Sequence, residues 1–343
     1  MGEIYLKAMI VTLVLLLFAV PGFALKKLNM IGDDGKKTLS NILLYVCQPA
    51  MILAAFTVFT DDEYAEILAT PRTDLLAGFG ISAAVALLAL VAVYGLCRLI
   101  FIKHKNRDAA DVYTFIAMFS NCGFLGVPFI KMFTGGSAVA VMYIMVFNIV
   151  FVVLIWTLGV YLITHDRKDI SAKKVLINPT IIASAVALIM FFVPQINFFM
   201  MDGVRELSTI PSALSTMTAP LAMMLVGVAL AELPIKNIFT NPSAYVAGAL
   251  RLIVAPLLTL GIAVVFYEMT AGYMGSLGGN ADYIFLAPVI AMAMSPASTV
   301  VAMIEHYGGE KELSVAAYVN NTLLSVITVP LVVMAVMEIW KFV

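Results

Sequence analysis

Residues 120–128, Ser-Asn-Cys-Gly-Phe-Leu-Gly-Val-Pro, carry the strongest chemical signal in the chain. Two glycines, an asparagine and a proline this close together predict an interrupted helix, because proline lacks a backbone N–H and glycine tolerates non-helical angles. A helix that restarts inside an apolar block turns free N–H groups and a partial positive charge toward its N-terminal end. That end can hold an anion such as a carboxylate.

A second interruption is predicted in residues 294–299, Met-Ser-Pro-Ala-Ser-Thr. Pro296 breaks the helix, and the nearby hydroxyls can bond the freed carbonyls or a ligand. Taken singly, each segment also fits a kinked and packed helix. Because the two segments occupy corresponding positions in the two halves of the chain, we favour a shared site where crossing half-helices offer their amide ends to an anion.

The candidate substrate-binding residues come from both segments and from polar side chains at depth in other apolar blocks. They are Asn121, Gly123, Gly126, Pro128, Ser295, Pro296, Ser298, Thr299, Gln48, Asn320 and Asn321. Asn148 lies at a similar depth, and each of these asparagines either bonds a neighbouring helix or lines the site. Nearly every Asp and Glu lies near the end of a block, which argues against a proton pump built on buried carboxylates.

The elements that position these residues are predicted to be transmembrane helices. The chain of 343 residues is 62% hydrophobic and 12% charged, with a mean hydropathy of +1.03, whereas a soluble domain carries about 25% charged residues. The apolar residues fall into ten blocks of the length that crosses a bilayer as a helix. The blocks are residues 4–25, 38–59, 75–101, 112–132, 138–163, 175–194, 208–231, 243–267, 283–304 and 314–340.

The order of the blocks predicts an inverted repeat. An N-terminal five-helix repeat, residues 1–164, is followed by a short cytoplasmic loop, 165–174, and a C-terminal five-helix repeat, 175–343. Because each half has an odd number of spans, the halves are inverted relative to each other, as in many secondary transporters. The fold class is therefore an all-α polytopic membrane protein of ten transmembrane helices, with helices four and nine broken.

Loop charge predicts the orientation. The loops after the first, third and fifth blocks are rich in Lys and Arg, and the loop after the second is acidic. Positively charged loops stay in the cytoplasm, so both termini are expected on the extracytoplasmic side of the cell (inner) membrane. The first block is long enough to span and ends in a poor cleavage site, so it is interpreted as a helix, not a signal peptide.

Two side chains have more than one interpretation. Arg251 lies well inside an apolar block, where it either extends to the cytoplasmic interface or acts electrostatically near the permeation path. His306 follows Glu305 at a predicted helix end and is either interfacial or sensitive to pH.

No enzymatic motif is present in the sequence. A Walker loop, a dinucleotide fingerprint and a zinc-protease helix are all missing. Cys47, Cys97 and Cys122 have the spacing of neither a zinc site nor a disulfide framework. A net charge of −1 gives no attraction to nucleic acid. We therefore expect no catalytic residue, metal or cofactor, and no nucleic-acid partner.

Three stretches of the chain resemble the auxin efflux carrier family, specifically its bacterial and archaeal members that resemble organic-acid permeases. The first is Gly-Phe-Leu-Gly-Val-Pro128, preceded by Asn121. The second is Tyr307-Gly-Gly-Glu-Lys-Glu-Leu-Ser, which leads into residues 321–331. The third is the opening region, with its Lys-Lys-Leu and Lys-Lys-x-Leu-Ser loop and Leu-Leu-Tyr-Val-Cys-Gln-Pro49.

The resemblance implies a homodimeric carrier of small organic anions, either auxin-like monocarboxylates or malate-like and malonate-like dicarboxylates. It also implies that the broken helices four and nine cross, with the crossover at Asn121 to Pro128 and Ser295 to Thr299. A scaffold domain and a transport domain, each built from both repeats, and an elevator-type movement are implied as well. The ninth block departs from the family pattern with Ser-Pro-Ala-Ser in place of a second Gly-x-Pro, so its crossover residue stays open. The loop after the fifth block lacks the long insert of the plant carriers, which favours a prokaryotic type.

Two other functions remain open. A sodium-coupled symporter needs oxygen ligands near both breaks. Gln48, Asn121 and Ser298 could supply some of them, but the sequence predicts no buried carboxylate to strengthen a sodium site. A membrane sensor without transport would normally carry a soluble domain in addition. Sodium dependence of uptake separates the first alternative from the leading one.

The predicted topology is tested by cysteine accessibility. Asp34→Cys and Asp169→Cys each introduce a thiol into a positively charged loop. Because these loops are predicted to be cytoplasmic, a membrane-impermeant maleimide should label them only after the cells are opened. Labelling of intact cells at either position would invert the orientation.

Overall fold

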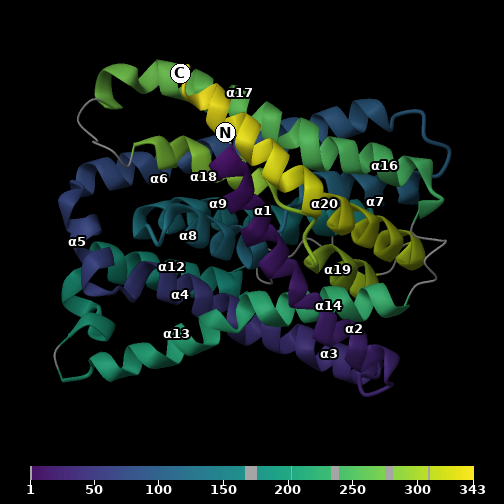
Figure 1. Ribbon diagram of the computed structural model, residues 1–343, viewed down its shortest axis with the longest axis horizontal. Coiled ribbons are helices and arrows are strands. Elements are labelled where there is room, and N and C mark those ends of the chain that lie inside the picture. The colour runs from purple at the N-terminus through teal and green to yellow at the C-terminus, as the bar shows by residue number, and fades with distance from the viewer. Residues whose placement is uncertain (1, 167–175, 202, 233–238, 275–280, 308–309) are drawn as a thin grey trace.

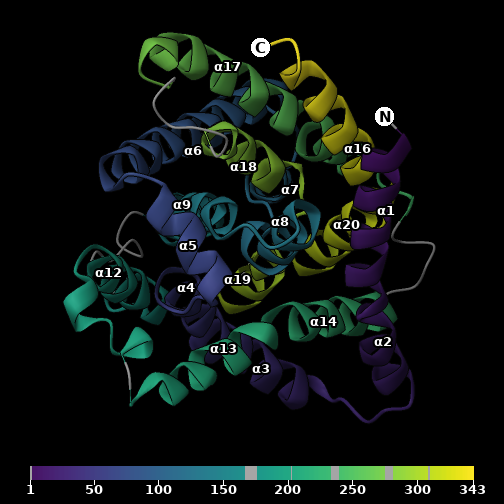
Figure 2. The ribbon, with the colours of Figure 1, turned by 60° about the vertical axis from the view of Figure 1, so that its left-hand side comes forward.

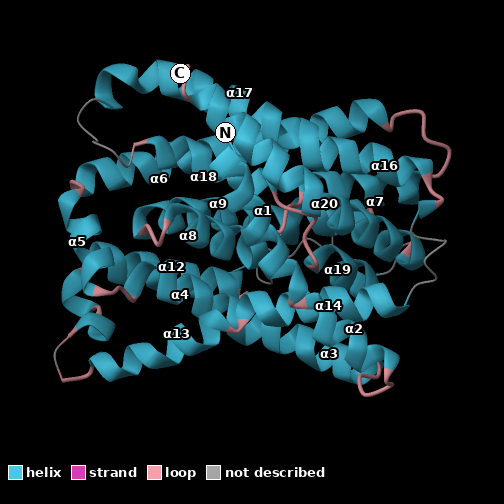
Figure 3. Cartoon of the chain, in the orientation of Figure 1, coloured by secondary structure: helices cyan, strands magenta, loops and turns pink. Residues whose placement is uncertain are grey.

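The protein is entirely helical in the part of the chain that the computed structural model describes, apart from one isolated β-bridge (Figures 1 and 3). That part comprises residues 2–166, 176–201, 203–232, 239–274, 281–307 and 310–343. Most of the predicted loop 165–174, and with it position 169, lies outside these residues. The α-helices are α1 Gly2–Leu17, α2 Ala19–Lys27, α3 Asp33–Ile42, α4 Gln48–Thr57, α5 Asp61–Ala69, α6 Arg72–Ile100, α7 Arg107–Met118, α8 Val127–Thr134, α9 Ala138–Leu154, α10 Val160–Thr164, α12 Pro179–Phe192, α13 Thr209–Thr216, α14 Thr218–Glu232, α16 Pro242–Ala249, α17 Ala255–Met274, α18 Asp282–Ala293, α19 Thr299–Tyr307 and α20 Lys311–Trp340.

The apolar blocks form helices as the sequence predicts. Within the described residues, seven helical stretches are long and apolar enough to cross a membrane: Tyr5–Lys27, Asp33–Thr57, Arg72–Ile100, Ala138–Thr164, Arg205–Glu232, Pro242–Thr270 and Glu312–Trp340. The fourth, sixth and ninth blocks contain the shorter apolar helices Cys122–Thr134, Pro179–Phe192 and Asp282–Ala293. The prediction of an all-α polytopic membrane protein is therefore confirmed.

The helices form two groups, which Figures 1 and 2 both show as a lower and an upper layer. The lower layer, here called the panel helices, consists of α2, α3, α4, α12, α13 and α14, with α2 along α14 and α4 against α12 and α13. The upper layer, the crossover group, consists of α6 to α10 and α16 to α20. The groups meet where α9 packs on α4 and α12, and α1 links them by packing on α20 and α8 as well as on α14.

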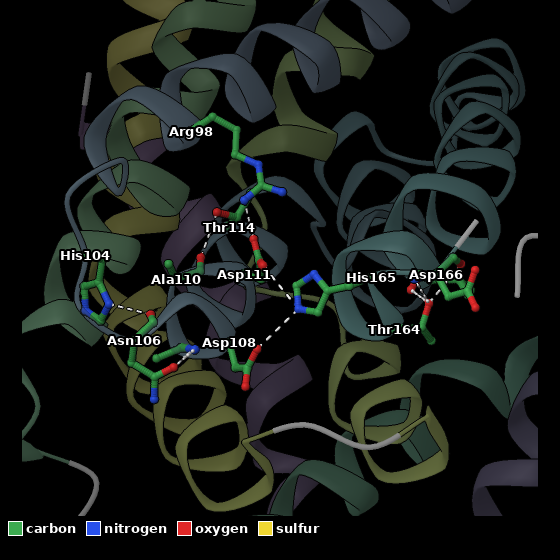
Figure 4. Close-up of polar contacts among 12 residues, drawn as sticks. Arg98, His104, Asn106, Asp108, Ala110, Asp111, Thr114, Thr164, His165 and Asp166 are labelled. Carbon is green, nitrogen blue, oxygen red and sulfur yellow. Dashed lines mark hydrogen bonds and ion pairs between the residues drawn. The ribbon is translucent and has the colours of Figure 1, made fainter. Parts of the chain in front are cut away.

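Connections that follow odd-numbered blocks meet at one end of the molecule. The His165 Nε2 after α10 lies 3.2 Å from the Asp108 Oδ1 at the start of α7, as Figure 4 shows. Asn106, in the same connection as Asp108, donates its Nδ2 hydrogen to Glu310 before α20 at 2.8 Å. This clustering is what helices that cross a membrane in alternating directions produce.

The remaining connections meet at the opposite end. The Lys131 ammonium pairs with Glu63 on α5 at 2.9 Å, and Arg205 pairs with Asp61 at 2.8 Å. Partial burial would raise the pKa of the Glu63 carboxyl, but hydrogen bonds from Thr60 and Lys131 outweigh it and hold that pKa below its usual value. The acidic loop that the sequence marks as extracytoplasmic is therefore partly neutralised by neighbouring connections.

Three of the spans contain a π-helical turn directly before a proline. The turns are Leu43–Cys47, Cys122–Gly126 and Leu250–Val254, and the helix after each has proline as its second residue, at Pro49, Pro128 and Pro256. Proline has no N–H to donate and its ring crowds the carbonyl of the preceding turn. A widened turn relieves both problems without ending the helix.

The panel helices α2 and α14 are in close backbone contact through two glycines. A Cβ atom added at Gly22 would lie 1.9 Å from the Met224 carbonyl oxygen, and one added at Gly227 would lie 1.9 Å from the Ala19 carbonyl oxygen. Small residues allow such approaches in membranes, where close packing drives helix association.

The glycine contact predicts a loss of stability on substitution. Gly22→Ala or Gly227→Ala should lower the thermal midpoint of the detergent-purified protein, because overpacking costs about 1–3 kcal/mol. Gly80→Ala is the matched control, since a Cβ atom there meets nothing within 4 Å. Equal midpoints for all three variants would contradict the contact.

Candidate functional site

The fourth and ninth spans are both broken, and the breaks lie against each other. Helix α7 ends at Met118 and the chain is helical again from Cys122, while α18 ends at Ala293 and α19 begins at Thr299. The intervening segments form the antiparallel bridge between Ser120 and Pro296. The Asn121 N–H donates to the Ser295 carbonyl at 2.7 Å, and the Ala297 N–H donates to the Phe119 carbonyl at 2.9 Å. Each break thus supplies hydrogen-bond partners for the other.

The break in the fourth span begins earlier than residues 121–128, where the family resemblance places the crossover. Residues 119–121 form the break, and Pro128 lies inside the restarted helix, where it accounts for the π-helical turn. Gly126 is also inside this helix, and a Cβ atom there would lie 3.0 Å from Ile144 and 3.4 Å from Met294. Gly126 and Pro128 are therefore not part of the break. In the ninth span, by contrast, Pro296 lies in the break and pairs with Ser120.

A cavity of about 10 Å³, here called the crossover cavity, lies beside the breaks and is lined by Gln48, Asn121, Gly123, Asn148 and Thr299 among others. Four of these five were candidates from the sequence, and Asn148 was the polar residue with two open interpretations. The structure brings them together from α4, the fourth span, α9 and the start of α19.

Hydrogen-bond donors dominate the polar lining of the crossover cavity. Among the described residues, the Nδ2 groups of Asn121 and Asn148 have no hydrogen-bond partner, although these side chains are only 2% and 1% exposed. The Asn148 Oδ1 accepts from the Cys122 Sγ at 3.4 Å, which orients the amide so that Nδ2 is left over. An unpaired buried donor costs about 1–3 kcal/mol, so both groups favour an acceptor ligand.

Backbone amides reinforce this polarity. The first N–H groups of a helix have no acceptor within it, and two helices begin at the crossover cavity, at Cys122 and Thr299. Gly123 keeps one of these ends accessible, because a Cβ atom there would lie 3.0 Å from the Asn148 Oδ1. The two helix N-termini and two side-chain amides together form a site suited to an anion.

Thr299 also lines two other cavities. One, of about 50 Å³ and here called the Lys36 cavity, includes Ser298, Tyr318 and Lys36. The Lys36 ammonium pairs with Glu232 at 2.6 Å. The other, of about 10 Å³, is shared with Gln48 and lies against α12. The proximity of Lys36 to Thr299 cannot be predicted from the sequence, because it depends on how the second span packs against the ninth.

Arg251 is fully buried, so the interpretation that it extends to the interface is wrong. Its guanidinium donates to the carbonyls of Ala117 and Met118 at 2.9 and 3.0 Å, and also to the Met292 carbonyl. These carbonyls belong to the last turns of α7 and α18, the first halves of the two broken helices. The contacts instead fit the electrostatic interpretation. The guanidinium lies at the C-terminal ends of α7 and α18, on the side of the breaks opposite the helix N-termini.

The remaining sequence candidates do not line the crossover cavity. Asn321 donates its Nδ2 hydrogens to the Ala317 carbonyl on its own helix at 2.7 Å and to the Ala244 carbonyl on α16 at 3.4 Å. Asn320 is fully buried on α20 and is not among the residues that line the three cavities described above. The Ser295 side chain is buried within the break. The side chain of His306 lies outside what the structure describes.

Comparison with known proteins gives one family. The family described as "Membrane transport protein" matches residues 6–333 of the chain. No curated protein matches the chain. The match covers all ten apolar blocks except the ends of the first and last. The chain is therefore a multi-pass membrane protein that belongs to the auxin efflux carrier family of transporters, and it is not an enzyme.

Proposed function

We propose that the protein is a secondary transporter of a small organic anion whose carboxylate binds in the crossover cavity. The observation that carries this proposal is the pair of unpartnered Nδ2 donors of Asn121 and Asn148 beside two helix N-termini. A carboxylate offers the acceptors that these groups lack, and charge-assisted hydrogen bonds are about twice as strong as neutral ones.

The charge of the lining supports an anion over a cation. Among the described residues, neither Asp nor Glu lines the crossover cavity or the two cavities that share Thr299, and Lys36 is the charged residue that lines them. An auxin-like monocarboxylate and a malate-like or malonate-like dicarboxylate are the substrate classes we propose.

The two groups of helices support an elevator-type mechanism. Gln48 belongs to the panel helix α4, whereas Asn121, Asn148 and Thr299 belong to the crossover group. The proposed scaffold is the panel and the proposed transport domain is the crossover group, each drawn from both five-helix repeats, 1–164 and 175–343. The substrate moves with the crossover group while Gln48 stays with the panel. The homodimer that the resemblance implies stays a prediction.

The function is tested by uptake into proteoliposomes. Asn121→Ala and Asn148→Ala should each lower uptake of labelled malonate or indole-3-acetate by about tenfold or more, since each removes a hydrogen bond to a charged group. Thr259→Ala is the control, because its buried hydroxyl bonds only the Ala255 carbonyl of its own helix, at 2.7 Å.

Each outcome decides between functions. Full uptake by both asparagine variants would remove the crossover cavity from the substrate site. A substrate-induced rise in the thermal midpoint without any uptake would instead identify a membrane sensor, because a ligand that binds the folded state stabilises it whether or not it is transported.

A further inference from the structure

The guanidinium of Arg251 bonds the ends of α7 and α18 at the breaks, and it has no acidic partner among the described residues. Its hydrogen-bond acceptors are the carbonyls of Ala117, Met118 and Met292 and the sulfur of Met292. No described carboxylate lies within ion-pair distance of it. A fully buried cation with no carboxylate is costly unless other negative charge surrounds it.

The C-terminal ends of α7 and α18 supply that negative charge. Each helix C-terminus has a partial charge of about −0.5, carried by carbonyls that have no partner inside the helix. Two such ends together balance roughly one positive charge. Arg251 therefore fits this position in charge, and its two terminal nitrogens reach acceptors on two different helices at once, while its Nε has no partner among the described residues.

Carbonyls of this kind are the ligands that sodium uses in coupled carriers. In transporters with discontinuous helices, unwound carbonyls and half-helix C-terminal ends coordinate the coupling cation, while the N-terminal ends face an anionic substrate. In this protein the N-terminal ends face the crossover cavity, but the carbonyl ends already bond an arginine. A sodium ion and the guanidinium cannot both occupy the space between the same carbonyls.

We propose that Arg251 is a built-in substitute for the coupling cation, so that the carrier moves its anion without sodium or another monovalent cation. This inference rests on the proposed function, and it names the coupling of the same site. Because the charge is covalently attached, the crossover stays neutralised when the substrate site is empty. Arg251 is a positioning residue, since it touches the helix ends and not the crossover cavity.

The test uses the thermal midpoint of the purified full-length protein in sodium, lithium, potassium or choline chloride at equal ionic strength. The wild-type midpoint should be the same in all four salts, because a cation that favours neither state shifts no equilibrium. Arg251→Ala should lower the midpoint by about 10 °C, since breaking a buried charge network is strongly destabilising. Guanidinium chloride at millimolar concentration should restore much of this loss by refilling the space between the carbonyls.

Arg98→Ala is the matched control for the rescue. Arg98 is a partly buried arginine at the end of α6 that pairs with Asp111 and bonds no helix C-terminus at the crossover. Its loss should not be restored by guanidinium. If Arg251→Ala does not fold, Arg251→Lys keeps one cation with fewer donors, and it should fold with a lowered midpoint that remains independent of sodium.

Uptake measurements complete the test, because they distinguish a failure of this inference from a failure of the proposed function. Wild-type uptake should be equal with and without a sodium gradient. Uptake that requires sodium, a wild-type midpoint that rises selectively in sodium, or an Arg251→Ala variant that guanidinium does not restore would each overturn the inference. If no organic anion is transported, the proposed function fails while the midpoints still decide the role of Arg251.

Discussion

The structure depends on one constraint: inside a bilayer, every backbone polar group needs a partner within the protein. Breaking two helices at mid-depth frees carbonyls and N–H groups where water is absent. The protein meets part of this need by placing the breaks side by side, so that Asn121 and Ser295, and Ala297 and Phe119, bond each other. Arg251 meets another part by bonding the carbonyls that α7 and α18 leave free.

The same solution separates charge across the crossover. On one side, the guanidinium of Arg251 bonds two helix C-termini. On the other, two helix N-termini face a cavity whose buried amides lack acceptors. This asymmetry favours an anion in the crossover cavity, although no cationic side chain is among the described residues that line it. The number of Lys and Arg residues is therefore a poor guide to such a site.

Much of this arrangement can be predicted from the sequence, because composition and proline or glycine positions act locally. Block length predicts the spans, and the Gly-rich and Ser-Pro segments predict both interruptions. The position of the first break cannot be predicted as well, since Pro128 is accommodated by a π-helical turn and the chain leaves the helix at residues 119–121 instead. Local propensity indicates that a helix is disturbed, but tertiary packing decides where it ends.

Side-chain roles were the hardest to predict, because they depend on which helices become neighbours. Asn148 and Asn321 look alike in the sequence, each a polar residue deep in an apolar block. Packing sets them apart: Asn148 lies next to the restarted fourth span and keeps a free donor. Asn321 packs against Gly248, where an added Cβ atom would lie 2.1 Å from its Oδ1, and bonds the α16 backbone. Arg251 is the extreme case, since its acceptors come from two helices far from it in the sequence.

These contacts also indicate which parts of the molecule can move together. Arg251 follows α16 directly and bonds both α7 and α18, while the bridge between Ser120 and Pro296 joins the two breaks. All of these belong to the crossover group, so the charged ends and the anion site are held in one body. Gln48 reaches the crossover cavity from the panel helices, which are joined by the close contact of Gly22 and Gly227. A displacement between the two groups would therefore separate Gln48 from a bound anion while leaving the helix ends, and the cation that balances them, in place around it.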